Sequence, residues 1–512
     1  MKPHCRGLRL LKVSIPVRHA YTGLVPARRS RLVPATATGA LVESLASLRQ
    51  SLDLPSGFPR AVLAEARDAA RSVPTDPAVA NLADLRDLEF LTIDPPGSPD
   101  LDQAMHFQQT SEGAVLHYAI ADVPAFVTPG GELDAEVRLR GQTLYAADGR
   151  IPLHPPVLSE DAASLVDNAD RRAYVWRFTL DSGARPLQTT LTRAIVRSRH
   201  RWSYPDAQAA LQHGSAPETL RTLAWFGPLR AQRESERGGA SLNVPETTIE
   251  VDHGTYRLQR NPPLPLEDWN AQVSLLTGMA AAEIMLAGGI GVLRTMPAAG
   301  VADVAAFRAQ TVALGIPWRD GIQYGDYLRT LDRDDPAALA VRSAAASLFR
   351  GAGYVAFDGR PPTQTLQAAI GAPYAHTTAP LRRLVDRWSL VVCEALANGR
   401  PVPEWARQSL PEIPKLMGRS DQRADQFDAA SIHRVEAALL HGQESAVFPA
   451  VVLAEQGGGS RVQLANSPVT ARVAGMRAPA GSRVEVRLER ADIATGEIEF
   501  AAVGASAGTT DR

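Results

Sequence analysis

The chain has 512 residues, of which 45% are hydrophobic and 21% are charged, which is typical of a soluble globular protein with about two to four domains. Its only cysteines, Cys5 and Cys393, exclude a disulfide framework and a cysteine-based zinc site, and they favour a reducing, cytoplasmic location. The formal net charge of −1 excludes a generally basic chain, so a nucleic-acid partner would need a local basic surface.

The N-terminus differs from the rest of the chain in charge. Its first 42 residues contain eight Lys or Arg residues and no Asp or Glu. They superficially resemble an organellar transit peptide, but prolines such as Pro3, Pro16 and Pro26 and the lack of an amphipathic face favour a flexible basic arm over residues 1–42. Residues 43–72 predict two short helices broken between Pro55 and Pro59, within an N-terminal helical region of residues 43–80.

Residues 81–400 predict a mixed α+β domain. Strand-like segments come first, at 89–94, 114–123, 173–181 and 189–204, and residues 134–145 read as helical and then extended. Helices then dominate, at 205–213, 216–236, 267–289, 303–314, 336–349 and 380–398. The apolar run 273–293 is long enough to span a bilayer, but Glu283 near its middle favours a buried core helix, so we expect no membrane partner.

The C-terminal part changes character twice. Residues 401–444 predict a helical connector that contains one long polar helix, roughly 415–440. Residues 445–504 contain five short strand-like runs separated by turns rich in Gly, Pro and Asp, a spacing that favours a small closed β-barrel of the OB type. Residues 505–512 are a tail.

The most informative stretch is "LTIDPPGSPDLDQAMHF", residues 91–107. A strand ends at Asp94, a proline-rich loop follows, and Asp100 and Asp102 leave that loop on the same side of an extended chain. Three carboxylates without His or Cys favour Mg²⁺, or Mn²⁺, over zinc, and such a site suits phosphodiester hydrolysis. On this stretch alone, a solvated acidic turn is the commoner reading.

Two further segments offer groups that suit RNA. In "PYAHTTAPLRRLVDR" (373–387), Pro380 predicts the first turn of a helix, which would place Arg382 and Arg383 where phosphate binds well; the alternative is a surface ion pair with Asp386. In "RGQTLYAADGRIPLHPPVLSEDAASL" (140–165), Tyr145 precedes a turn and could stack on a base, and the alternative is a half-buried core tyrosine.

The segment 192–204 interleaves basic and aromatic residues, ending in Trp202 and Tyr204. Its arginines occupy odd positions and would share one face of a strand, which suits a groove for single-stranded nucleic acid. The alternative is the solvated, charge-protected face of an edge strand. The arginines are Arg193, Arg197, Arg199 and Arg201.

Together these motifs resemble the catalytic domain of the ribonuclease II-like (RNB) exoribonucleases from about Leu88 to Asn398, including "YAIADVPAFV", "IPLHPPVLSE" and "AAASLFRGAGYVAFDG". The β-barrel follows where this family carries an OB-type RNA-binding domain. The resemblance implies an Mg²⁺-dependent enzyme that degrades single-stranded RNA from the 3′ end to nucleoside 5′-monophosphates. It also implies that Asp94 and Asp100 are metal-site carboxylates and that Asp102 is the aspartate on which the chemistry depends most.

The same resemblance implies that Tyr145 packs against the 3′-terminal base and that Arg382 holds the scissile phosphate. The chain departs from the family at Gln103, where a fourth aspartate is usual. An amide oxygen can ligate magnesium but brings no charge, so we expect weaker metal binding. The first 80 residues lack the usual cold-shock-type barrels, and the C-terminal barrel has only Phe448 and Phe500 as aromatic residues.

The leading hypothesis is therefore a hydrolytic 3′→5′ exoribonuclease. The second is a catalytically weak or inactive RNA-binding protein of the same fold, and the third is an unrelated Mg²⁺ phosphoesterase acting on small phosphates. The oligomeric state stays open, with a monomer favoured.

Overall fold

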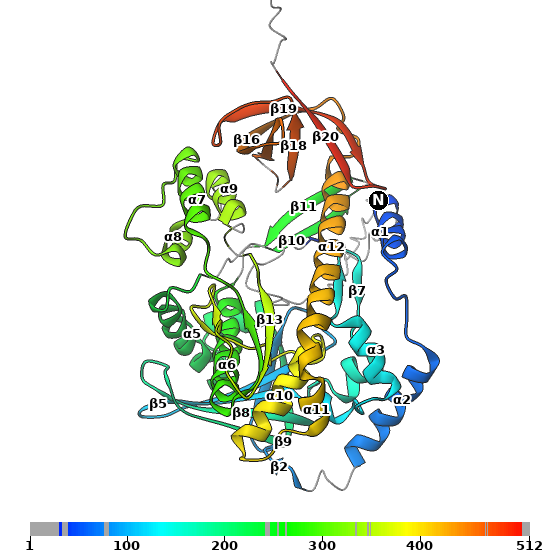
Figure 1. The fold of residues 1–512 in the computed structure, drawn as a ribbon, viewed down its shortest axis with the longest axis vertical. Coiled ribbons are helices and arrows are strands. Elements are labelled where there is room, and N and C mark those ends of the chain that lie inside the picture. Colours follow the sequence, from blue (N-terminus) through cyan, green and yellow to red (C-terminus); the bar gives the residue numbers. More distant parts are fainter. Residues whose placement is uncertain are drawn as a thin grey trace, which may run out of the picture.

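The computed structural model describes residues 30–32, 39–75, 81–240, 246–252, 255–261, 264–332, 335–345, 348, 350–465, 467 and 469–503. Most of the predicted basic arm and all of the tail 505–512 lie outside these residues. The predicted α+β architecture is confirmed: a helical N-terminal region, a large mixed body and a C-terminal five-stranded barrel follow one another along the chain (Figure 1).

The body is built on a six-stranded sheet. Its strands are β2 (Ala83–Asp84), β3 (Phe90–Asp94), β4 (Gln103–Gln109), β5 (Gly113–Ala121), β8 (Asp170–Asp181) and β9 (Pro186–Ser203), in the order β2-β9-β3-β4-β5-β8. The long β9 pairs antiparallel with β8 along its first part and parallel with β3 along its last part. Because β8 and β3 are also linked through β5 and β4, these strands form a closed ring of pairings. All five residues of β3 are buried, which places the end of this strand inside the domain.

Helices cover the sheet and form the main core with it. They include α4 (Tyr204–Gln212), α5 (Glu218–Glu236), α6 (Pro265–Gly288), α10 (Leu384–Ala397) and α11 (Glu404–Ser409). Of the helices in the described ranges, α6 is the one long and apolar enough to cross a membrane, but 67% of its most apolar window is buried inside the protein. The prediction of a buried core helix is confirmed.

The structure contains elements that the sequence analysis missed. The strands β10 (Glu246–Asp252) and β11 (Thr255–Asn261) form a hairpin, β1 (Ser30–Leu32) pairs with β10, and β12 (Ile290–Thr295) pairs with β13 (Gly353–Asp358). A short helix, α8 (Tyr324–Thr330), lies between α7 (Val301–Ala313) and α9 (Pro336–Ala345). The apolar run that begins in α6 continues into β12 beyond Gly289, whose φ of 70° ends the helix, and an unbroken apolar run does not distinguish a buried helix from a buried strand.

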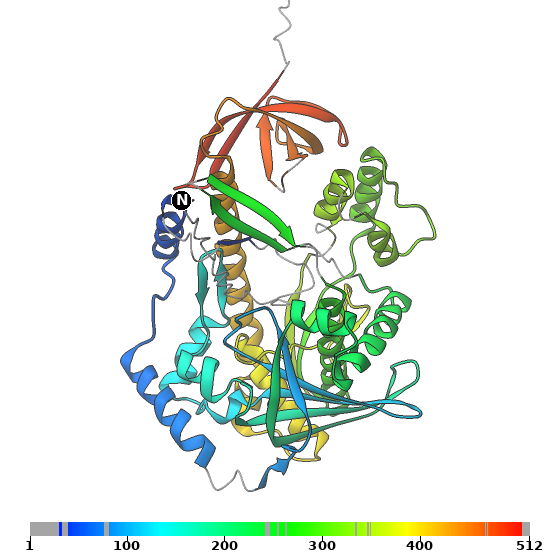
Figure 2. The ribbon, with the colours of Figure 1, turned by 180° about the vertical axis from the view of Figure 1, so that it is seen from behind.

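The C-terminal barrel closes in the order β16-β17-β18-β20-β19. Its strands are β16 (Val447–Gln456), β17 (Gly459–Leu464), β18 (Thr470–Ala474), β19 (Arg483–Asp492) and β20 (Glu497–Ala502). Phe448 and Phe500 contact each other edge to face with ring centroids 6.0 Å apart, and Phe500 is only 5% exposed, so the Phe500 ring belongs to the barrel core and is no stacking platform. The long helix α12 (Ile413–Leu440) runs from the body up to the barrel (Figures 1 and 2).

The N-terminal helices are α1 (Ala40–Ser51) and α2 (Arg60–Ser72). Helix α1 packs beside α12 and against the hairpin of β6 (Leu144–Ala146) and β7 (Gly149–Ile151) (Figure 1). Leu41, Leu45 and Leu48 supply the buried face of α1. The first helix therefore supports the hairpin that carries the predicted base-stacking tyrosine.

Replacing Leu45 with alanine is expected to lower the free energy of unfolding by about 2–5 kcal/mol, because Leu45 is fully buried and its loss leaves a cavity. Urea denaturation followed by circular dichroism measures this change. Leu139, which is 72% exposed, provides the matched control, and Leu139→Ala is expected to change stability by at most about 0.5 kcal/mol. Equal effects of the two substitutions would contradict the role assigned to α1.

Candidate active site

The acidic stretch connects two neighbouring strands of the central sheet. Asp94 is the last residue of β3 and Gln103 is the first residue of β4, and the two strands pair antiparallel. The loop between them turns at Gly97, whose φ is 75°, and the Ser98 backbone N–H donates to the carbonyl of Pro95. Because β3 and β4 pair antiparallel, the two ends of the loop lie at the same edge of the sheet.

The three aspartates are buried, with exposed fractions of 7% for Asp94, 2% for Asp100 and 0% for Asp102. A solvated acidic turn is therefore excluded as a reading of this stretch. Buried carboxylates need compensating donors or cations, because desolvation of an isolated charge is costly. The partners of these side chains show what provides that compensation.

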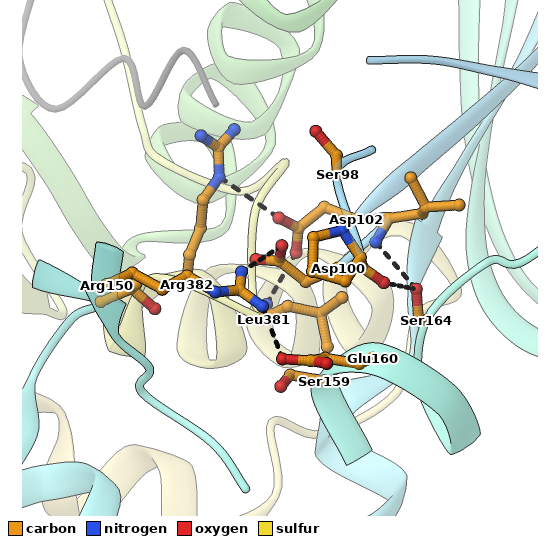
Figure 3. Close-up of polar contacts among 12 residues, drawn as sticks. Ser98, Asp100, Asp102, Arg150, Ser159, Glu160, Ser164, Leu381 and Arg382 are labelled. Atoms are coloured by element: carbon orange, nitrogen blue, oxygen red, sulfur yellow. Dashed lines mark hydrogen bonds and ion pairs between the residues drawn. The ribbon is translucent and has the colours of Figure 1, made fainter. Parts of the chain in front are cut away.

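Asp102 is held by the segment that precedes α10. Its Oδ1 accepts a hydrogen bond from the Leu381 backbone N–H at 2.7 Å, and its Oδ2 lies 3.2 Å from Nε of Arg382. The Asp102 carbonyl accepts from the N–H of Ala121, which fixes the backbone on the other side. Asp102 thus connects the acidic loop directly to the arginine that was predicted to hold phosphate (Figure 3).

Asp100 is paired with an arginine that the sequence analysis did not single out. Arg150, in β7, forms an ion pair with Oδ1 of Asp100, and its Nη2 lies 2.7 Å from Oε1 of Glu160 (Figure 3). Burial alone would lower the pKa of Arg150, but Asp100, Tyr145 and Glu160 together outweigh it, so the pKa is raised above its ordinary value. Arg150 is therefore a permanent cation inside the acidic site.

Asp94, at the end of β3, acts electrostatically on two buried tyrosines, Tyr204 and Tyr118. Burial raises the pKa of Tyr204, and the carboxylate of Asp94 raises it further. Burial likewise raises the pKa of Tyr118, and Asp94 and Asp102 both add to that shift. The two carboxylates therefore lie within electrostatic range of one phenol.

The side chains of the acidic loop are the type of ligand that Mg²⁺ or Mn²⁺ prefers, but their arrangement does not form a metal-binding group. Buried carboxylate oxygens are the ligands that these hard cations prefer. Within the described ranges, however, no group of three or more His, Cys, Asp or Glu side chains is close enough to hold a metal ion. A convergence of all three aspartates on one ion is therefore not seen. Asp100 lies in an ion pair with Arg150, and Asp102 in one with Arg382.

Gln103 is fixed by a backbone contact. Its Nε2 donates to the carbonyl oxygen of Thr378, in the same segment that carries Arg382. A carboxylate at this position would face that carbonyl without a hydrogen to donate. The amide thus connects the acidic loop to the segment that carries Arg382, and its own oxygen is a candidate ligand.

The two arginines before α10 have different surroundings. Helix α10 begins at Leu384 with Arg383 as its N-cap residue, so the prediction that Pro380 lies in the first helical turn is wrong. Arg383 is 2% exposed, and its Nε and Nη2 each lie 2.9 Å from a carboxylate oxygen of Asp386. Arg383 is therefore engaged with Asp386, the partner considered in the alternative reading, and of the two arginines Arg382 is the one that contacts the acidic loop.

Tyr145 lies in β6, directly opposite Arg150 in the β6–β7 hairpin. It is half-buried, which was the alternative considered for this residue. The Asp148-Gly149 dipeptide beside two short extended runs is a hairpin signal, and with it Arg150 could have been placed opposite Tyr145 from the sequence. Its positive charge alone did not identify Arg150 as a site residue, because the chain contains many arginines.

The predicted arginine face of β9 is divided in the structure. The pairing of β3 with β9 skips one residue between Ser198 and His200, and such a bulge exchanges the two faces of a strand. Arg197 pairs with Asp170, whereas Arg201 donates to the carbonyl of Ser98 in the acidic loop. The prediction of one shared face is wrong, and its premise of strict alternation fails at the bulge.

The other two arginines of β9 also make contacts inside the protein. Nη2 of Arg193 lies 2.6 Å from Oδ2 of the fully buried Asp122, and Nη2 of Arg199 donates to the carbonyl of Arg86. These contacts favour a structural role for Arg193.

A partly buried ion pair, between Arg294 and Asp421, also lies in this region. Nη1 of Arg294 is 2.8 Å from Oδ2 of Asp421 on α12, and Nε2 of Gln142 is 3.3 Å from the other carboxylate oxygen. Gln142 also forms a β-bridge with Arg383. This pair anchors α12 to the site, and nothing in the sequence pattern of the polar helix distinguished Asp421 from its acidic neighbours.

Three histidines in the body make stability depend on pH. Burial lowers the pKa of His154 from 6.5 to about 4, and a hydrogen bond to the Leu381 carbonyl offsets only part of that shift. Burial also lowers the pKa of His117 to about 4 and that of His376 well below its ordinary value. The unfolded chain takes up these protons near pH 6.5, whereas the folded chain excludes them until about pH 4.

The free energy of unfolding is therefore expected to fall as the pH is lowered from about 6.5 to about 4, because the unfolded state then binds more protons. Urea denaturation at pH 7, 6 and 5 measures the slope. In His154→Gln the slope is expected to be smaller by up to about one proton. A wild-type stability that does not change across this range would contradict the burial of neutral histidines.

Comparisons with known proteins agree with this architecture. Residues 82–396 match the family model described as the RNB domain, and residues 446–503 match the one described as the RNase II-type exonuclease C-terminal S1 domain. The chain is 32% identical over 187 residues to the exosome complex exonuclease RRP44 of Mus musculus, which is 36% of this chain and 20% of that protein. The chain thus spans about a fifth of the length of that curated relative.

Two solved structures share the fold. The structure of Mycoplasma genitalium RNase R in complex with ribose methylated single-stranded RNA has a TM-score of 0.80 at 18% identity and covers 91% of this chain and 78% of its own. The structure of yeast Ssd1, a pseudonuclease, has a TM-score of 0.67 at 16% identity and covers 88% of this chain and 57% of its own. Since the RNB model matches more than half of the chain and the predicted barrel coincides with the S1 match, this chain belongs to the RNB family.

Proposed function

We propose that the chain is a divalent-metal-dependent exoribonuclease that hydrolyses single-stranded RNA from the 3′ end and releases nucleoside 5′-monophosphates. The observation that carries this proposal is the contact between Asp102 and Arg382, which joins a buried acidic loop to a guanidinium in one site. Curated relatives of the RNB family named as exonucleases support the reaction class.

The site residues have separate roles in this proposal. Asp102 orients Arg382 through Nε, which leaves the guanidinium fork in a fixed plane to bind a phosphate through parallel hydrogen bonds. Tyr145, on the supported hairpin, packs against the terminal base. Mg²⁺ or Mn²⁺, held by Asp94 and Asp102 with the Gln103 oxygen, would polarise the phosphate and lower the pKa of water.

Two substrates compared under the same conditions test the proposal. Purified protein with Mn²⁺ is expected to release mononucleotides from single-stranded RNA and to leave bis(p-nitrophenyl) phosphate essentially unchanged. A chelator is expected to stop the reaction. Hydrolysis of the small diester with no action on RNA would instead favour the unrelated phosphoesterase.

A second candidate function is RNA binding without cleavage. It is favoured by Gln103, which removes a charge from the site, and the likeness to the pseudonuclease Ssd1 shows that this fold also occurs in a pseudonuclease. Activity of the wild-type protein excludes this function. An inactive wild type that gains activity in Gln103→Asp would establish it, since the substitution restores the carboxylate usual in the family.

A further inference from the structure

We infer that a cavity beside helix α2 binds a nucleoside monophosphate, at a site separate from the acidic loop. The cavity has a volume of about 710 Å³ and is bounded by α2, β2, the strands β8 and β9, and the π-helical turn η5 (Val157–Ala162). Helix α2 and strand β2 lie at the end of the body that is far from the barrel (Figure 1). Binding of a small ligand here goes beyond the proposed function and holds whether or not the chain cleaves RNA.

The cavity is separate from the candidate active site. Among the described residues that line it, none comes from the acidic loop 94–103, and Arg382 is not one of them. Turn η5 contributes to both places: Glu160 contacts Arg150 in the active site, whereas the next residue, Asp161, lines the cavity. A ligand in the cavity can therefore be distinguished by mutation from a ligand at Arg382.

The charged side chains of the lining favour an anion. They are five arginines and three aspartates, an excess of two positive charges. The arginines are Arg67, Arg71, Arg86, Arg171 and Arg172, and the aspartates are Asp84, Asp161 and Asp170. Arg86 and Arg171 already pair with aspartates of the lining, Asp170 and Asp161. An anion therefore needs arginines whose donors are not used by these carboxylates.

Arg172, in β8, has donors that are not used inside the protein. Its side chain is only 9% exposed, and its Nε lies 3.3 Å from Oδ2 of the fully buried Asp122. The same oxygen is shared with Arg193, whose Nη2 lies 2.6 Å away. Within the described ranges, Nη1 and Nη2 of Arg172 have no hydrogen-bond partner. Buried N–H groups require an acceptor, and a phosphate oxygen in the cavity would supply a strong one.

Arg67, on α2, supplies a second guanidinium from a different wall of the cavity. It is exposed and makes no hydrogen bond or ion pair with any residue that the structure describes. Arg71, one turn further along α2, is instead paired with Asp68. Arg67 and Arg172 thus line the cavity from a helix and from a strand. We expect one phosphate group to accept hydrogen bonds from both.

The rest of the lining suits a nucleoside attached to that phosphate. Apolar side chains, among them Phe126, Val157 and Ile195, offer contact area for a base. The side chains of Asp84 and Asp170 are 59% and 37% exposed, and their carboxylates can accept hydrogen bonds from ribose hydroxyls. Pockets of roughly 300–1,000 Å³ hold ligands larger than a free phosphate, which would leave most of this cavity to water.

Isothermal titration calorimetry of the full-length protein with adenosine 5′-monophosphate tests the inference, with a chelator present so that no metal ion contributes. The wild-type chain is expected to bind the nucleotide at a single site. Arg67→Gln is expected to weaken binding about tenfold, because a charge-assisted hydrogen bond is lost. Adenosine and inorganic phosphate, titrated separately, are each expected to bind at least about tenfold more weakly than the nucleotide, because each lacks half of the contacts.

Arg60→Gln is the matched control, since Arg60 is an exposed arginine of the same helix that does not line the cavity. Arg60→Gln and Arg382→Gln are both expected to bind the nucleotide with wild-type affinity. Arg172→Lys keeps a positive charge beside Asp122 but loses the fork, so it is expected to weaken binding at least as much as Arg67→Gln. Thermal denaturation shows that each variant is folded, and added nucleotide is expected to raise the melting temperature less in Arg67→Gln than in Arg60→Gln.

The possible outcomes separate this site from the proposed function. A folded wild-type protein that binds no nucleotide would overturn the inference, and so would inorganic phosphate that binds as tightly as the nucleotide. Loss of binding in Arg382→Gln with unchanged binding in Arg67→Gln would place the nucleotide at the acidic loop and would also overturn it. Absence of RNA hydrolysis, by contrast, would overturn the proposed function alone.

Discussion

Replacing Asp102 with asparagine is expected to lower the rate of RNA hydrolysis roughly 100-fold or more, the order found when one preorganised electrostatic group is removed. Asp102 is fully buried and accepts from the Leu381 N–H while it pairs with Nε of Arg382. Asparagine keeps the size of the side chain but removes its charge, and its NH₂ group must face either a backbone N–H or a guanidinium. The substitution therefore disorients Arg382 and removes a candidate metal ligand in one step.

A buried aspartate elsewhere in the body distinguishes this loss from general destabilisation. Oδ2 of Asp134 accepts from the Gly130 N–H at 2.9 Å, and the carboxylate pairs with Arg138 and Arg387. Asp134→Asn is expected to cost stability of about 1–3 kcal/mol while the folded fraction keeps its activity. Equal loss of specific activity in both variants, measured at a temperature where both are folded, would contradict the catalytic role of Asp102.

Replacing Arg382 with lysine is the second change with a large expected effect, on the order of a 100-fold loss in kcat/KM. Lysine keeps the positive charge beside Asp102 but lacks the planar fork that binds two phosphate oxygens at once. The loss is expected to appear mainly in kcat, because an oriented guanidinium is worth most where charge develops during the reaction. Steady-state kinetics on single-stranded RNA measures both parameters.

The neighbouring arginine provides the contrast. Arg383 is buried against Asp386 through two contacts of 2.9 Å, so Arg383→Lys is expected to lower stability by roughly 1–3 kcal/mol and to leave kcat of the folded enzyme within about threefold of wild type. Should Arg383→Lys lose as much activity as Arg382→Lys without unfolding, the structural role assigned to Arg383 would be wrong.

Much of the architecture could be predicted from local patterns. Alternation of apolar residues located β5, β8 and β9, and the periodic runs located α5, α6 and α12. Regular spacing of turns predicted the five-stranded barrel. The strand β12 was missed because a fully buried strand lacks alternation. The strands β10 (ETTIEVD) and β11 (TYRLQRN) each contain only two apolar residues, so their alternation is a weak signal.

The site was predicted less completely, for reasons that lie in tertiary structure. Burial of Asp94, Asp100 and Asp102 and the contact of Asp102 with Arg382 depend on segments about 280 residues apart in sequence, and only the resemblance to a known family had joined them. The ion pair between Arg150 and Asp100 could not be read from charge, since both residue types are common. The bulge between Ser198 and His200 was enough to assign the arginines of a correctly predicted strand to the wrong face.

Single-stranded RNA labelled at its 5′ end tests the central claim most directly, when it is incubated with the purified full-length protein and Mn²⁺ and sampled over time. The account predicts labelled fragments that shorten one nucleotide at a time from the 3′ end, with nucleoside 5′-monophosphates as products and no shortening in Asp102→Asn. Intact RNA throughout, with a folded protein that still binds the strand, would contradict it.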